Sequence, residues 1–167
     1  MIDRRFAIRL AITALAAAWL ASPAARAQDF KKLTPFLVDL PGWTGAKADG
    51  MAMQMPGMSV ITATRDYKRG NEKVTASVIF GSTAQGMLAA VQPGMKLETA
   101  ELHMNTATVD GLTVARTFNV PEKSGSVLVA LGPSALFSLA FTDVPEDEAL
   151  ALAKGFDWKA IQAALPK

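Results

Sequence analysis

The chain has 167 residues, half of them hydrophobic, with 17 basic and 15 acidic side chains. This length suits one domain with one hydrophobic core. The sequence contains no cysteine, which excludes a disulfide scaffold and a lipid anchor on cysteine. It contains one histidine, which excludes a zinc site built on two or three histidines.

Residues 1–27 have the pattern of a secretory signal peptide. A basic segment precedes an uncharged apolar run, and Ala25-Arg26-Ala27 supplies the small residues that precede a cleavage site. The run is too short for a membrane span, which needs about 20 helical residues. We predict Sec-type export with cleavage near Ala27-Gln28, which gives a periplasmic or secreted protein without stable membrane insertion. A twin-arginine signal is the less favoured alternative, because Asp3 precedes the Arg4-Arg5 pair.

Cleavage would leave a nearly neutral single domain over residues 28–167. The first 27 residues hold four of the 17 basic side chains and one of the 15 acidic ones, so 13 basic and 14 acidic side chains remain. No basic stripe remains to bind a nucleic acid or an anionic membrane surface. We therefore expect neither of these partners.

The N-terminal part of this domain predicts a short helix and a methionine-rich strand. Thr34 is a typical helix N-cap, Pro35 suits the first helical position, and Pro41-Gly42 ends the helix. Residues 51–55 alternate methionine with alanine and glutamine, which is the period-two pattern of a strand. Pro56-Gly57 then predicts a tight turn.

The middle of the domain predicts a hairpin and a helix. Residues 59–67 and 73–80 have the alternation of strands, and a polar five-residue loop that contains Gly70 joins them. One face of the second strand is strongly apolar, which predicts a sheet with one well-buried face. Residues 84–91 carry the small and aliphatic side chains of a short helix, which Pro93-Gly94 ends.

The rest of the chain predicts an antiparallel meander followed by two helices. Short turns separate the strand-rich runs, and short connections permit only antiparallel neighbours. One helix follows Pro145, and a second follows Asp157 as N-cap, with Phe156 and Ile161 placed as a hydrophobic staple. The predicted fold class is α+β, an antiparallel sheet of about six strands with helices packed on one face. The strand-rich runs are residues 97–109, 112–120, 126–131 and 136–142.

The residues that most suggest chemistry are Met51, Met53, Met55 and Met58. Thioether sulfur is a soft ligand that selects Cu(I), and such chemistry suits an exported protein. Residues two apart in a strand are about 6.8 Å apart, so Met55 and Met58, across the turn, form the better pair. His103-Met104 would add ligands if its strand lies alongside. Methionine on one strand face is more often a core filler, which is the favoured alternative to a metal site.

Four other side chains are candidates for contact with a ligand or partner: Trp43, Arg65, Tyr67 and Arg116. Arg65 and Tyr67 share one strand face. Arg116 interrupts the apolar series of its strand, so it needs either a structural ion pair, which we favour, or an anionic group bound in a pocket. Trp43 and Trp158 each lie beside a turn or a cap, where an aromatic side chain commonly seals the core.

The sequence lacks the common catalytic and nucleotide-binding motifs. It contains no G-x-S-x-G elbow, no G-x-G-x-x-G fingerprint and no P-loop, and His103 suits an ordinary strand residue. We therefore predict a soluble, non-enzymatic periplasmic accessory or binding protein without a cofactor, whose partner is an unidentified envelope protein or small ligand. The alternative is a periplasmic Cu(I)-binding protein that uses the methionines of residues 51–58.

Three segments resemble a group of small uncharacterised exported bacterial proteins. They are Leu40-Pro41-Gly42-Trp43, Thr64-Arg65-Asp66-Tyr67, and Ala-Lys-Gly-Phe-Asp-Trp at residues 153–158. The resemblance covers most of residues 28–167 and implies a common fold and an envelope location, with no site residues to transfer. The order of elements also resembles the small α+β sheets of the Mog1/PsbP-like group, whose members are accessory or binding proteins, and this is an analogy of fold only.

Overall fold

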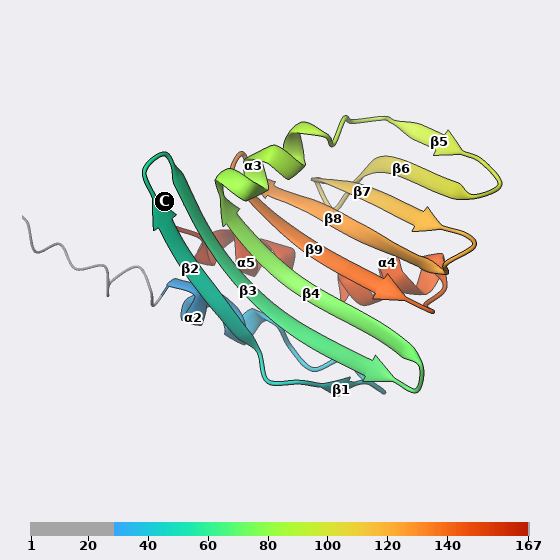
Figure 1. The fold of residues 1–167 in the computed structure, drawn as a ribbon, viewed down its shortest axis with the longest axis horizontal. Coiled ribbons are helices and arrows are strands. Elements are labelled where there is room, and N and C mark those ends of the chain that lie inside the picture. Colours follow the sequence, from blue (N-terminus) through green and yellow to red (C-terminus); the bar gives the residue numbers. More distant parts are fainter. Residues whose placement is uncertain (1–28, 167) are drawn as a thin grey trace, which may run out of the picture.

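The computed structural model of the chain describes residues 29–166, which form one antiparallel sheet with four α-helices and a short 3-10 helix (Figure 1). The predicted signal peptide, residues 1–27, lies outside the described residues. In the described part, no helix is long and apolar enough to cross a membrane. The elements in chain order are α2 (Asp29–Leu33), η3 (Thr34–Phe36), β1 (Thr44–Gly45), β2 (Asp49–Met55), β3 (Met58–Arg69), β4 (Glu72–Gly81), α3 (Ser82–Ala89), β5 (Lys96–Glu98), β6 (Leu102–Val109), β7 (Leu112–Asn119), β8 (Ser124–Gly132), β9 (Ala135–Thr142), α4 (Glu146–Lys154) and α5 (Trp158–Ala164).

The α+β class and the antiparallel pairing are confirmed, but the described residues form nine strands rather than about six. The strand order is β1-β3-β4-β9-β8-β7-β6-β5, and β2 also pairs with β3. Gly45 pairs with Tyr67, and Asp49 pairs with Thr64. The short strand β1 and the longer β2 therefore occupy successive stretches of the same sheet edge.

The strand predicted at residues 97–109 is two strands, because the chain reverses at Thr99. The Thr99 hydroxyl oxygen accepts hydrogen bonds from the backbone N–H groups of Leu102 at 2.9 Å and Glu101 at 3.3 Å. The Thr99 N–H donates to the Leu102 carbonyl oxygen at 3.0 Å. A threonine hydroxyl that bonds to the following backbone stabilises a turn without glycine or proline. β5 consequently folds back on β6 as an additional edge strand.

Two groups of strands meet at the pairing of β4 with β9. The β3–β4 hairpin is confirmed, although its turn is only Gly70-Asn71 rather than a five-residue loop. Strands β6 to β9 form the predicted meander. β9 lies beside β4 from the pair Phe80 and Ala135 to the pair Lys73 and Thr142. This pairing of strands that are distant in the sequence unites the two groups in one sheet.

The hydrophobic core lies on one face of the sheet, which α2, α4 and α5 cover (Figure 1). α2 packs on β2 and β3, whereas α4 and α5 pack on β8. α3 lies at one end of the opposite face, against β3, β4 and β9 (Figure 1), so the prediction that the helices pack on one face is correct for α2, α4 and α5 and wrong for α3. Within residues 29–166, the rest of that opposite face carries no helix. Core side chains that are less than 2% exposed include Leu33, Leu37, Ala63, Tyr67, Val74, Val78, Val127, Phe137, Leu139 and Ile161.

The first helix lies earlier in the chain than predicted. α2 ends at Leu33 and η3 follows directly, so Thr34 is not a helix N-cap and Pro35 lies in the 3-10 turn. The Thr34 hydroxyl donates instead to the Lys31 carbonyl oxygen at 3.2 Å. Leu33 is fully buried and Phe30 packs against the core. Burial of these two side chains decides the position of a short helix, because helices of this length depend on packing.

The two C-terminal helices lie where the sequence predicted them. α4 follows Pro145, and α5 is capped by Asp157, whose carboxylate accepts a hydrogen bond from the Ala160 N–H at 2.9 Å. Phe156 and Ile161 are 2% and 0% exposed, as expected for a hydrophobic staple. The staple fixes the angle between the α4–α5 turn and the sheet.

Candidate functional site

Four methionines of the β2–β3 hairpin form a surface that we call the thioether patch: Met51, Met53, Met55 and Met58. Met51 pairs with Thr62 and Met53 pairs with Val60, whereas Ile61 between them is buried in the core. Directly opposed residues share one face of a sheet, and consecutive residues alternate between faces. The patch therefore lies on the face opposite to α2, α4 and α5.

The side chains of the thioether patch are exposed, at 42% to 51% of their surface. The interpretation of these methionines as core filling is therefore wrong. The small residues between them take the inward positions: Ala52 packs against the core, and a Cβ on Gly50 would lie 2.7 Å from the Phe30 ring. β2 thus presents its small residues to the core and its thioethers to solvent.

The register brings the sulfur atoms of three patch residues within reach of one point. Met55 and Met58 are directly opposed across the Pro56-Gly57 turn, so their Cβ atoms are about 5 Å apart. Met53 precedes Met55 by two residues on the same face, about 6.8 Å away. A methionine side chain has three flexible bonds. Met53, Met55 and Met58 can therefore converge above the end of the hairpin.

A hollow of about 440 Å³ adjoins the thioether patch where α3 begins. Gly81 shapes it, because its φ is 107° and a Cβ there would lie 1.9 Å from the Ser59 carbonyl oxygen. The hollow combines apolar with hydroxyl-bearing walls, and the residues that line it include Met55, Met58, Phe80, Ser59, Ser82 and Ser134.

His103 and Met104 do not extend the thioether patch. Their strand, β6, is separated from β3 by β4, β9, β8 and β7. The expectation that these two residues add ligands is therefore wrong. The His103 Nδ1 atom instead lies 3.1 Å from a carboxylate oxygen of Glu146. Among residues 29–166, no group of three or more histidine, aspartate or glutamate side chains is arranged to hold a metal ion.

Arg65, a predicted contact residue, holds the chain that follows α2 against β3. Its Nη1 donates to the Leu37 carbonyl oxygen at 2.7 Å, and its Nε donates to the Ala46 carbonyl oxygen at 2.8 Å. Its Nη2 forms an ion pair with Asp39. All three donor groups of the guanidinium are therefore engaged within the chain, which gives Arg65 a structural role.

Tyr67 supports the same segment from inside the core. Its side chain is 1% exposed, and its hydroxyl donates a hydrogen bond to the Val38 carbonyl oxygen at 2.7 Å. Burial raises the pKa of Tyr67 from 10.0 to about 12, although the positive charge of Arg65 lowers it in part. A buried and already bonded hydroxyl is not available to a ligand, so this side chain too is structural.

Trp43 is 8% exposed and seals the core, which matches the structural interpretation of this residue. The Arg69 guanidinium lies 4.5 Å from the centre of its ring. Arg69 is also bonded to Glu72 at 3.0 Å and to Glu148 at 2.7 Å. The hydrogen bond from Arg69 lowers the pKa of Glu72. This arrangement covers the indole and joins the β3–β4 turn to α4.

Arg116 lies apart from the other candidate residues, in β7 on the core side of the sheet. It is partly buried between Val114 and Phe118, both of which contact the core. Its guanidinium forms no hydrogen bond or ion pair with any residue of the described range. The favoured expectation of a structural ion pair is therefore wrong for residues 29–166. Lys96 and Asn105 lie beside it. Sequence reasoning missed Lys96 because it missed the reversal at Thr99, and it missed Asn105 because the sequence pattern does not determine the register between β6 and β7.

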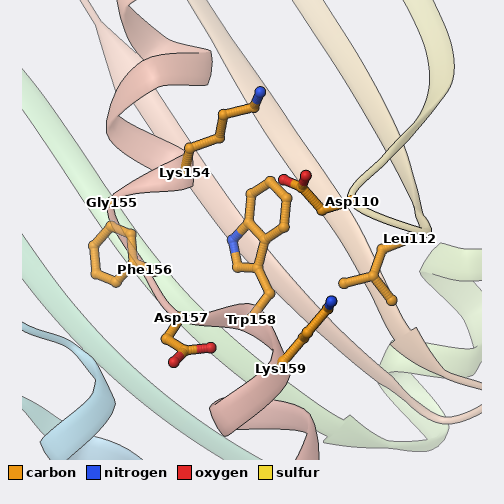
Figure 2. A pocket seen from close by; sticks show the side chains of 8 residues that line it. All are labelled: Asp110, Leu112, Lys154, Gly155, Phe156, Asp157, Trp158 and Lys159. Atoms are coloured by element: carbon orange, nitrogen blue, oxygen red, sulfur yellow. The ribbon is translucent and has the colours of Figure 1, made fainter.

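A further hollow, of about 400 Å³, lies between the α4–α5 turn and the β6–β7 turn (Figure 2). The Trp158 indole stands at its centre, with Lys154 and Lys159 on either side and Asp110 facing them (Figure 2). Trp158 is only 5% exposed, so it forms a wall of the core as predicted. Asp157 is engaged in capping α5. The lining of this hollow thus combines a buried aromatic wall with charged side chains of both signs.

No family model, curated protein or solved structure matches this chain. The resemblance of the Leu40-Pro41-Gly42-Trp43 segment to exported bacterial proteins stays a prediction.

Proposed function

We propose that this chain is an exported, non-enzymatic binding protein whose binding surface is the thioether patch. The observation that carries the proposal is the exposure of four methionines, at 42% to 51%, on one side of an edge hairpin. Large contiguous apolar patches on a protein surface often mark an interaction site. The signal-like sequence of residues 1–27 supports a location in the periplasm or outside the cell.

Cu(I) is the ligand that fits the chemistry of the patch, and this is the second, more specific function. The supporting observation is the direct opposition of Met55 and Met58, with Met53 on the same face. Soft thioether sulfur selects Cu(I) over harder cations. The chain has no cysteine and a single histidine, so thioethers are the main soft ligands that it can offer.

Titration of the mature protein with Cu(I) against a competing chelator, without oxygen, tests this function. We expect one tightly bound Cu(I) per chain. Replacing Met53, Met55 and Met58 together by leucine should weaken binding at least about 100-fold, or about 2.8 kcal/mol. Leucine keeps the apolar volume and removes only the sulfur. Unchanged affinity in this variant would rule out the copper site.

The matched control replaces methionines outside the patch by leucine, at Met87, Met95 and Met104. This control variant should bind Cu(I) as the unmodified protein does, because none of these three methionines belongs to the thioether patch. If both variants lose Cu(I) affinity equally, the copper is bound by methionines throughout the chain and not by the thioether patch.

The broader proposal of a binding surface is tested by site-specific photocross-linking in intact producing cells. A photoreactive residue at position 53 should give a defined adduct, and aspartate in place of Met55 should abolish it. The control position is Leu97, which is similarly exposed at 46% on the opposite edge of the sheet. If the patch neither binds copper nor gives a position-specific adduct, the proposed function is wrong.

A further inference from the structure

A small hollow of about 190 Å³ lies at the other end of the sheet from the thioether patch. It lies on the core side, where β5, β6 and β7 extend past α4, and Glu146 at the start of α4 borders it. Pockets for whole drug-sized molecules measure about 300–1,000 Å³. A hollow of this size therefore suits one functional group or a very small molecule. Its polar lining residues are Lys96, Glu98, His103, Asn105, Arg116 and Glu146.

Three side chains that donate hydrogen bonds lie next to one another on neighbouring strands in this hollow. Lys96 pairs with Asn105, and Asn105 pairs with Arg116, on three adjacent strands. Directly opposed residues lie on the same face, and adjacent strands are about 4.8 Å apart. An ammonium, a carboxamide and a guanidinium group thus project side by side. All three can donate hydrogen bonds to an oxygen atom.

The two carboxylates of the hollow already have partners. Glu98 lies 3.3 Å from the Lys96 ammonium, and both side chains are more than 60% exposed. Glu146 lies 3.1 Å from the His103 Nδ1 atom. An exposed ion pair contributes little stability, about 0–1 kcal/mol. Lys96 can consequently exchange Glu98 for a bound ligand at small cost.

Arg116 is the remaining charge of the hollow, and it has no partner among residues 29–166. A partly buried guanidinium without a hydrogen-bond acceptor is unfavourable. Its planar fork of donors matches the two oxygen atoms of a carboxylate. An oxyanion in the hollow would supply the missing acceptor.

We propose that Lys96, Asn105 and Arg116 form an anion-binding site for the carboxylate of a small monocarboxylic acid. The site is separate from the thioether patch and from the function proposed for it. Glu98 and Glu146 line the same hollow, and their charges disfavour a ligand with more than one negative charge. This repulsion favours a monocarboxylate over phosphate.

Titration of the isotope-labelled mature protein with propionate, followed by NMR, tests the proposal. The side-chain signals of Asn105 and Arg116 should shift and saturate at millimolar propionate. Arg116→Gln and Lys96→Gln should each weaken binding at least tenfold, about 1.4 kcal/mol. Lys96 is 68% exposed, so its substitution leaves the fold intact even if the substitution of Arg116 does not.

Two controls separate a built site from general electrostatic attraction. Lys73→Gln removes one exposed positive charge from β4 and should leave propionate binding unchanged. Glu98→Gln should strengthen binding several-fold, because it frees Lys96 and removes a negative charge from the lining of the hollow. The triple leucine variant of the thioether patch should bind propionate normally, which makes this test independent of the copper test.

Three results would overturn the proposal. The first is an affinity for propionate that does not change in the Arg116→Gln and Lys96→Gln variants. The second is a failure of the Asn105 and Arg116 signals to approach saturation. The third is tighter binding of inorganic phosphate than of propionate, which would reassign the hollow to a different oxyanion.

Discussion

Replacing Tyr67 by phenylalanine is expected to lower the free energy of unfolding at neutral pH by about 1–2 kcal/mol. The ring keeps its edge contact with Phe156, at 6.3 Å between centroids, so the packing changes little. The loss arises at the Val38 carbonyl oxygen, which no longer receives the hydroxyl hydrogen bond of 2.7 Å. Val38 itself is 41% exposed, so water replaces part of that bond and keeps the loss moderate.

The same hydroxyl makes the stability of the unmodified protein decline at alkaline pH. The pKa of Tyr67 is about 12 in the folded chain, against an ordinary value of 10.0. Between these values the unfolded chain has lost a proton that the folded chain retains, so stability is full below pH 10 and falls as the pH approaches 12. The rise of the Tyr67 pKa from 10.0 to about 12 corresponds to a decrease of at most about 2.7 kcal/mol in the free energy of unfolding. Solvent screening reduces the expected decline to about 1–2 kcal/mol.

Urea unfolding of the two proteins over this pH range measures the effect. The contributions of lysine and arginine cancel in the difference between the two free energies of unfolding. That difference should shrink from pH 10 to 12, and Tyr67→Phe should approach or exceed the unmodified protein in stability. Tyr67 is the only tyrosine of the chain, so tyrosinate absorbance reports its pKa directly. A folded-state pKa near 10, or a difference that does not vary with pH, would refute the burial of this hydroxyl.

Two further predictions concern local geometry. Asp157→Ala should lower the free energy of unfolding by about 1 kcal/mol, because the Ala160 N–H loses its cap, whereas Asp157→Ser should retain most of it; urea unfolding measures both. Gly81→Ala should lower the free energy of unfolding by about 3 kcal/mol, because the added Cβ would lie 1.9 Å from the Ser59 carbonyl oxygen. Gly57→Ala is its control, with a φ of 78° but open space around it, and should cost only about 1–2 kcal/mol in the same assay. Equal losses at the two glycines would contradict the close approach at position 81.

Features of the fold that depend on local sequence were predictable. The alternation of residues 73–80 and the polar turn before them predict the β3–β4 hairpin, and Asp157 predicts the start of α5. These signals depend on side-chain periodicity and on capping, which neighbouring residues determine. The edge strand β5 was missed, because a threonine hydroxyl rather than glycine or proline makes the turn at Thr99.

The candidate site was less predictable, because it depends on contacts between distant residues. The methionine spacing predicts a shared strand face, but only the packing of Ala52 against the core shows which face is exposed. From the sequence, Arg65 is a candidate for contact with a ligand or partner. In the structure it donates hydrogen bonds to the carbonyl oxygens of Leu37 and Ala46, which are distant in the sequence. For Arg116 the sequence offered two alternatives, and the neighbours that distinguish them come from other strands.

The insertion of β9 between β4 and β8 has a consequence for the timing of folding. The β3–β4 hairpin has one unpaired edge until residues 135–142 have been synthesised, because only β9 covers it. Pairing between strands so distant in the sequence is slow, since a long loop must close first. For a chain that we propose is exported, this delay favours passage through the secretion channel before the sheet can close. The topology itself would then keep the sheet open at least until residues 135–142 are available for pairing.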